Sequence, residues 1–129
     1  MAGKARKRPT DGELEILQVL WERGPSTVRE VFQVLSEQRG SGYTTVLKLM
    51  QIMADKELVS RDETVRPQVY KVSRTQSQTQ RQLLGDILDR AFRGSSGKLV
   101  LQALSTKKAT AEERQQIRDL LDSMEEESK

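Results

Sequence analysis

Apolar residues recur at helical spacing in three segments of the first sixty residues. The first segment opens with Thr10-Asp11-Gly12-Glu13, a capping box in which the threonine hydroxyl accepts from the N–H of Glu13 and the glutamate reaches back. Its stripe consists of Leu14, Ile16, Leu17, Leu20 and Trp21. Gly24 followed by Pro25 is a usual signal for the end of a helix. The pattern predicts one helix between these limits.

The two segments that follow have the same character. Thr27 and Glu30 form a second capping box. The stripe behind it is Val28, Val31, Phe32 and Leu35, and "QRGSG" interrupts it. Residues 42–59 read "GYTTVLKLMQIMADKELV", and we expect Ser41 to cap the helix that they form. Three consecutive helices are therefore predicted.

The hydrophobic period changes after Val59. Residues 58–62 and 68–73 read "LVSRD" and "QVYKVS", with Val69 alternating with Lys71 across the second segment. Short alternating segments on either side of a polar loop predict a β-hairpin. Three helices and a hairpin in this order predict a winged helix-turn-helix domain over residues 10–75.

Residues 76–129 return to helical spacing. The polar run "SRTQSQTQRQ" that leads into them is either the exposed start of a helix or a short hinge, and "RGSSGK" is a later break. Thr110 and Glu113 form a third capping box. Some fifty residues in three helices can hardly bury this much hydrocarbon alone, so we expect a dimerisation domain that packs against a second copy. The expected interface is Leu84, Ile87, Leu88, Phe92, Leu99, Leu101, Leu104, Ile117, Leu120 and Leu121. The predicted fold is mostly α with a small β-hairpin wing.

The third helix has an unusual outer face. At about 100° per residue, Val46, Met50 and Met53 share the inward side. The opposite side carries Thr44, Thr45, Lys48 and Gln51. Short hydroxyls, an amide and one cation are side chains that can approach base edges in the major groove. We therefore predict that these four residues contact DNA. The alternative is the ordinary polar side of a surface helix.

Further cations lie on or beside the predicted wing and at the N-terminus. Arg61, Arg66 and Lys71 are expected to contact the DNA backbone, although charged residues are more often plain solvated surface. Tyr70 is either a core aromatic or a phosphate donor, and the core is favoured. Residues 1–9 form a basic arm whose cations are Lys4, Arg6, Lys7 and Arg8. The arm either contacts DNA or has no structural role.

The distribution of charged residues indicates the sign of the charge on the expected partner. The 129 residues are 35% hydrophobic and 32% charged, with a net charge of +3. Residues 1–75 hold 13 lysines and arginines against 10 acids, whereas residues 76–129 hold 9 of each. An anionic partner should therefore meet the N-terminal half.

Catalytic chemistry finds little support in the sequence. The chain has no cysteine and no histidine, which excludes thiol nucleophiles, disulfides, zinc-finger spacing and imidazole bases. We expect no metal, no cofactor and no enzymatic activity. No apolar run approaches ~18 residues, and the basic N-terminus lacks the apolar segment of a signal peptide. A cytoplasmic protein without membrane insertion is expected.

Several of these stretches together resemble the penicillinase-repressor family of the BlaI/MecI type, which has a copper-responsive branch. They are "TDGELEILQVLWERGPSTVREVFQVL", "YTTVLKLMQIMADKELV" with "VRPQVYKV", and "LLGDILDRAFRGSSGKLVLQALS" followed by "TAEERQQIRDLLD". The resemblance runs over residues 10–123. It implies a homodimeric transcriptional repressor that binds a palindromic operator and is released when a signal acts on its dimerisation region.

Two departures from the family pattern limit what carries over. The copper branch has a C-terminal cysteine motif, which this chain lacks. Penicillin-responsive members are cut by a membrane-bound sensor metalloprotease at an Asn-Phe bond, in the helix that resembles residues 99–105. Gln102-Ala103, after Leu101, occupies that place here, so cleavage in this region requires a protease with a different preference.

Two other classes of function compete with repression. Winged helices also serve as protein-interaction adaptors, which would need no Thr/Lys/Gln face and would show no salt-dependent DNA affinity. A small hydrolase that used carboxylates would need a constellation that the sequence does not contain.

Overall fold

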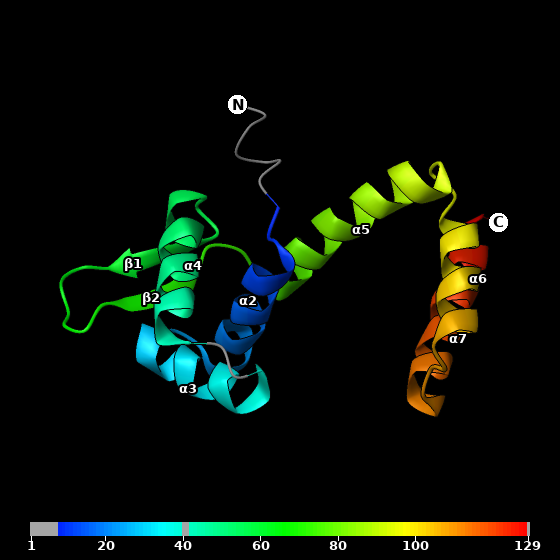
Figure 1. The fold of residues 1–129 in the computed structure, drawn as a ribbon. Coiled ribbons are helices and arrows are strands. Elements are labelled where there is room, and N and C mark those ends of the chain that lie inside the picture. Colours follow the sequence, from blue (N-terminus) through cyan, green and yellow to red (C-terminus); the bar gives the residue numbers. More distant parts are fainter. Residues whose placement is uncertain (1–7, 40–41, 129) are drawn as a thin grey trace. The chain divides into compact units, whose positions relative to one another are not determined.

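In the computed structural model, the described residues are 8–39 and 42–128 (Figure 1). Backbone contacts divide them into two compact units, one ending at Leu83 and the other beginning at Leu84. Helices dominate, and the two strands form one small antiparallel sheet. The predicted fold class, mostly α with a β-hairpin wing, is confirmed.

The first two helices begin at the predicted capping boxes. Helix α2 spans Asp11–Arg23, and Thr10 and Glu13 exchange hydrogen bonds of 2.9 and 3.3 Å. Gly24 ends it with φ of 89°, a conformation that glycine adopts without a side-chain clash. Helix α3 spans Val28–Arg39 and opens with the matching exchange between Thr27 and Glu30. That exchange also lowers the pKa of the Glu30 carboxyl, chiefly through the backbone hydrogen bond to Thr27.

Helix α4 spans Tyr43–Asp55, and its first turn corrects one prediction. The residue at the N-cap is Gly42, not Ser41, which lies outside the described residues. Gly42 has the extended backbone of an N-cap but carries no side chain that could accept a hydrogen bond. The helix starts one residue later than expected, and no side chain of the described residues caps it.

The hairpin consists of β1, Val59–Asp62, and β2, Val69–Val72. The register pairs Val59 with Val72 and Asp62 with Val69, close to the predicted strands. A third backbone segment joins the sheet at one point: Ser26 donates to the Tyr70 carbonyl at 2.9 Å, and Tyr70 donates to the Ser26 carbonyl at 2.8 Å. This pair of bonds, the Ser26–Tyr70 bridge, fastens the hairpin to the connection between α2 and α3.

The core of this unit lies between the three helices and the hairpin. Helix α2 packs on α3, α4 and β2, and α4 also packs on β1. The buried apolar residues are Ile16, Leu17, Val19, Leu20, Val28, Val31, Leu35, Val46, Met50, Met53, Val59 and Tyr70. Tyr70 is only 2% exposed, as favoured by the sequence. Glu13 is equally buried, and its carboxylate is 2.7 Å from the Lys56 ammonium.

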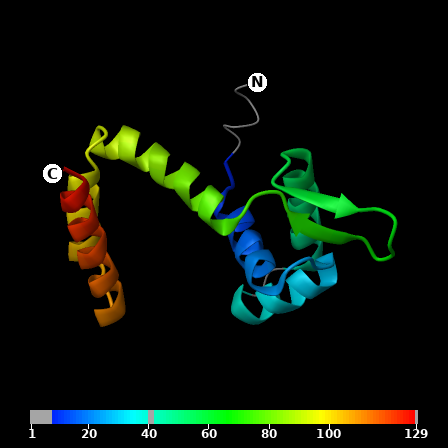
Figure 2. The same ribbon diagram turned by 180° about the vertical axis from the view of Figure 1, so that it is seen from behind.

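Three more helices follow the hairpin: α5 (Gln76–Phe92), α6 (Ser96–Thr106) and α7 (Ala111–Ser128). The polar run over residues 73–82 is the start of a helix rather than a hinge. Helix α5 begins at Gln76 within this run, and Thr75 and Gln78 form a capping box at its first turn. The predicted box of Thr110 and Glu113 opens α7. Both ribbon views show α6 and α7 running in opposite directions (Figure 2).

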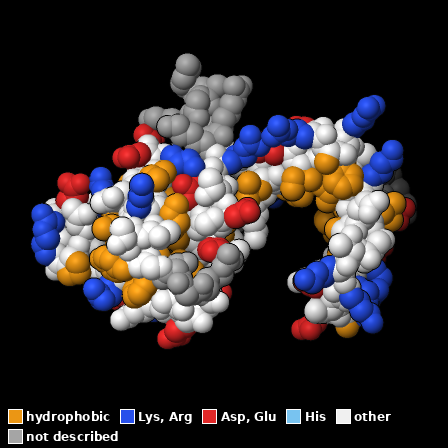
Figure 3. Space-filling view, in the orientation of Figure 1, with side chains coloured by type: hydrophobic (Ala, Val, Ile, Leu, Met, Phe, Trp, Pro, Cys, Tyr) orange, Lys and Arg blue, Asp and Glu red, His pale blue; other side chains and the backbone are white. Residues whose placement is uncertain are grey.

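The second unit exposes its hydrophobic side chains. No residue of α6 or α7 is buried. Figure 3 shows apolar side chains at the surface along α5. The large exposed ones beyond Leu83 are Leu84, Ile87, Val100, Leu101, Leu104, Leu120, Leu121 and Met124. In the part of the chain that the structure describes, none of the helices is long and apolar enough to span a membrane.

Candidate nucleic-acid interface

Helix α4 separates an apolar side from a polar side. Val46, Met50 and Met53 are at most 1% exposed and hold the helix against the core. Thr44, Thr45, Lys48 and Gln51, the four residues predicted to contact bases, are all exposed. The structure therefore brings the predicted set onto one accessible face of a firmly anchored helix.

The N-terminal end of α4 is electrostatically open to an anion. Gly42 provides no side-chain hydrogen bond, and the first turn contains no acidic residue. The first N–H groups of a helix have no partner within it, and the helix dipole places partial positive charge there. An oxygen of a phosphate group is a suitable acceptor for these donors.

An aromatic and a cation that the sequence did not single out lie beside this helix start. The Tyr43 ring is in edge-to-face contact with Phe32 at 5.6 Å, and the Arg29 guanidinium carbon lies 5.1 Å from the Tyr43 ring centre. A hollow of about 510 Å³ between α3, α4 and the hairpin includes Arg29, Tyr43 and Gln51 in its lining. Arg29 and Tyr43 belong to different helices, so only their packing reveals the pair.

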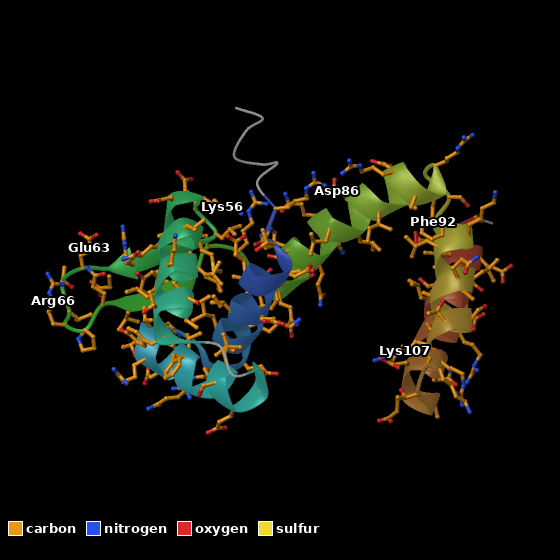
Figure 4. The ribbon with its side chains drawn as sticks, in the orientation of Figure 1. Lys56, Glu63, Arg66, Asp86, Phe92 and Lys107 are labelled. Atoms are coloured by element: carbon orange, nitrogen blue, oxygen red, sulfur yellow. The ribbon has the colours of Figure 1, made fainter. Side chains whose placement is uncertain are left out.

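The three predicted wing cations have different surroundings. Arg66 is exposed and donates to the Glu63 carbonyl at 2.8 Å, and Figure 4 shows both residues at the free end of the hairpin. Arg61 is half-buried, lies 3.7 Å from the Glu63 carboxylate, and hydrogen-bonds Tyr70, which raises its pKa. Lys71 is exposed on β2. Arg66 and Lys71 are therefore more accessible to a phosphate than Arg61.

The Asp62 carboxylate, at the end of β1, is a negative charge on the hairpin with donors of its own close by. The Thr64 side chain and backbone N–H both donate to Asp62. These bonds, with a smaller contribution from Lys71, lower the pKa of the Asp62 carboxyl. The carboxylate is thus held within the loop by local donors.

Of the four cations in the basic arm, the structure describes Arg8. Lys4, Arg6 and Lys7 lie outside the described residues. Arg8 is exposed, and its carbonyl accepts a hydrogen bond from Lys56 at 3.3 Å. Lys56 also pairs with Glu13, so the chain that leaves α2 toward the N-terminus is attached near the end of α4.

Three helices, a hairpin fastened by the Ser26–Tyr70 bridge and an exposed face on the third helix define a winged helix-turn-helix protein. A family model described as "Penicillinase repressor" matches residues 9–123. The chain belongs to this family, which is one of transcriptional regulators.

Curated relatives match a shorter part of the chain. Two proteins named "Transcriptional regulator BlaI", from Mycobacterium tuberculosis strains CDC 1551 / Oshkosh and ATCC 25618 / H37Rv, are each 45% identical to it over 51 residues. The matched stretch covers 37% of this chain and 37% of each relative. The chain thus matches little more than a third of the length of these relatives.

Proposed function

We propose that the protein is a homodimeric transcriptional repressor that binds a palindromic operator through α4. The observation that carries the proposal is the accessible face of Thr44, Thr45, Lys48 and Gln51 on a helix whose opposite side is buried. Repression follows from occupancy of promoter DNA and needs no chemical step. Membership of a repressor family supports the same function.

Each part of the interface has a role that fits its chemistry. The two threonines suit thymine methyl groups or phosphates, Gln51 suits adenine, and Lys48 suits guanine or a phosphate. The N–H groups at the start of α4 suit a phosphate, and Arg29 is near enough to the same helix start to add a positive charge. Arg66 and Lys71 extend the contact to the backbone beside the groove.

Two copies are required because one such module makes few contacts. The uncovered hydrophobic side chains of α5, α6 and α7 support a dimer interface in the second unit. A two-fold dimer presents two α4 helices to two half-sites related by the same symmetry. Tethering makes the second contact effectively intramolecular, so separation of the copies releases the operator.

Release by a membrane-bound sensor metalloprotease is one way to separate the copies. Leu101, Gln102 and Ala103 are exposed on α6, and Leu101 is 67% exposed. They are nevertheless helical, and a protease acts on segments that open locally. Cutting at this place would therefore require partial unfolding of α6 as well as a protease suited to Gln102-Ala103.

The proposal is tested with Lys48→Ala and DNA from upstream of the protein's own gene. If Lys48 touches a base, its loss should weaken operator binding by roughly 1–3 kcal/mol and affect random duplex less. Fluorescence anisotropy at two salt concentrations measures both affinities.

Arg81→Ala is the matched control, because it removes one exposed cation from α5 instead. We expect it to change neither the operator affinity nor the ratio of operator to random affinity appreciably. A wild-type protein that ignored every duplex at low salt would overturn the proposed function. Equal losses on both duplexes would assign Lys48 to a phosphate.

A further inference from the structure

The apolar stripe of α7 is spaced to fit a second copy of itself. Leu120, Leu121 and Met124 are 56%, 53% and 51% exposed and share one side of the helix with Ile117. The steps between these residues are three, one and three positions, which read the same in either direction. Two antiparallel α7 helices therefore place Ile117 opposite Met124 and Leu120 opposite Leu121.

The charges along the same segment are divided by sign. Residues 107–118 contain the cations Lys107, Lys108, Arg114 and Arg118 with two glutamates, whereas residues 119–128 contain five acids and no cation. Figure 4 shows Lys107 where α6 ends and the chain turns toward α7. The acidic end is also the C-terminal end of α7, where the helix dipole disfavours negative charge. Within the described chain, residues 125–127 form no ion pair that would offset this cost.

One of the acids lies on the same flank of the stripe as two of the cations. At about 100° per residue, Arg114, Glu125 and Arg118 fall within about 40° of one another. Among the described residues, neither arginine has an acidic partner: Arg114 donates to the Ala109 carbonyl, and Arg118 donates to the Gln115 side chain. Each guanidinium keeps further N–H groups for another acceptor.

The direction of pairing decides which charges meet. A two-fold axis brings the same patch of each copy together, so an antiparallel pair places the partner's Glu125 between Arg114 and Arg118. A parallel pair places equal residue numbers at equal heights and brings the two acidic ends together. Opposite charges on the flanks of paired helices select orientation, which favours the antiparallel pair.

The surface around Ile117 has room for a partner side chain. A hollow of about 380 Å³ lies between the end of α6 and the start of α7, and its lining includes Leu104, Arg114, Ile117 and Arg118. The spacing of the stripe brings the partner's Met124 to this hollow and the partner's Glu125 to its basic rim. An apolar hollow with a basic rim thus matches an apolar residue followed by an acid.

We propose that α7 pairs antiparallel with α7 of a second copy, and that Glu125 of each copy binds Arg114 and Arg118 of the other. The inference deepens the proposed homodimer and rests on it. It assigns to these three charges the choice of orientation between the copies.

A charge-swap experiment on the full chain tests the pairing. Glu125→Lys and the double variant Arg114→Glu/Arg118→Glu each turn two symmetry-related attractions into repulsions. Each should weaken its own homodimer by about tenfold, the combined effect of two surface contacts of ordinary strength. A mixture of the two variants restores opposite charges at both contacts. Native mass spectrometry should therefore find heterodimer well above the statistical half.

Glu126→Lys is the matched control, since it makes the same change one residue away, about 180° from the centre of the stripe. Mixed with the double variant, it should give the statistical fraction. Arg118→Glu alone replaces the double variant if circular dichroism shows that the latter is unfolded. A statistical mixture of Glu125→Lys with either arginine variant would overturn the antiparallel pairing while leaving the dimer intact. A monomeric wild-type protein in sedimentation would overturn the proposed homodimer as well.

Discussion

Glu13 shows how one side chain can serve a helix start and a tertiary contact together. Its Oε1 atom accepts from the Thr10 N–H at 2.9 Å and from the Lys56 ammonium at 2.7 Å, and the residue is 2% exposed. Lys56 follows the last residue of α4, so this atom connects the first turn of α2 to the C-terminal end of α4.

Removal of the Lys56 charge should therefore destabilise the fold. Lys56→Met retains most of the side-chain volume but leaves the buried Glu13 carboxylate without its cation, which should cost about 2–3 kcal/mol. Urea unfolding followed by circular dichroism measures the loss. Lys48→Met makes the same change at an exposed position of α4 and should cost less than about 0.5 kcal/mol. Equal stability of the two variants would show that the Glu13–Lys56 pair contributes nothing.

The Glu13–Lys56 pair also shows which contacts of single residues could not be predicted from the sequence. Glu13 was predicted as a capping residue because its partner Thr10 is three positions away. Lys56 lies 43 positions from Glu13. Apolar periodicity and capping motifs relate residues only a few positions apart, so they do not predict a contact between residues so far apart in the chain. The contact of Arg29 with Tyr43 was missed for the same reason.

At the scale of elements, local rules predicted most boundaries. The Thr27 and Thr110 boxes form as expected, because each bond joins residues three apart. Thr75 and Gln78 form another box with the same signal, which the polar composition around them obscured. The start of α4 was placed one residue early, since a serine is a better cap than a glycine by propensity alone.

The N-cap of α4 has no side chain, and substitutions there should affect the stability of the fold and the affinity for DNA differently. A Cβ at Gly42 would meet no atom within 4 Å, and its backbone suits any residue. Gly42→Asn and Gly42→Asp should both add a cap and stabilise the protein by about 0.5–1 kcal/mol. Only the aspartate places negative charge where a phosphate is proposed, so it alone should weaken DNA binding, by about tenfold or more.

Thermal unfolding and fluorescence anisotropy measure the two effects, and the asparagine variant is the control for the added side chain. If both variants bound DNA as the wild type does, the proposed phosphate contact at the start of α4 would be wrong. If both lost affinity equally, crowding rather than charge would be responsible.

At the scale of the whole molecule, the two units differ in how they bury apolar surface. The first has a closed core that includes Ile16, Val31 and Met50, each 0% exposed. The second leaves Leu101 and its apolar neighbours in contact with solvent. The sequence predicted both properties, because the amount of hydrocarbon in residues 76–129 exceeds what so few residues can cover. It could not predict which faces of the helices meet.

Leu101→Asp tests whether these faces hold two copies together. Because Leu101 is 67% exposed, the change should leave the single chain folded and place a charge in the proposed interface. We expect monomers in sedimentation equilibrium and at least about tenfold weaker operator binding, since the two α4 helices are no longer tethered. Leu101→Ala should have a smaller effect in the same direction. A fully dimeric Leu101→Asp protein would exclude Leu101 from the interface.

The Ser26–Tyr70 bridge holds the strand end of the hairpin against the rest of the first unit, whereas the loop at the other end is exposed. Beyond the strand pairing that ends at Asp62 and Val69, residues 63–67 are exposed. Insertions or deletions there would alter how far the loop reaches along a duplex without disturbing the packing of Tyr70 below it. Under the proposed mode of DNA binding, loop length therefore sets the reach of the wing independently of the core that supports it.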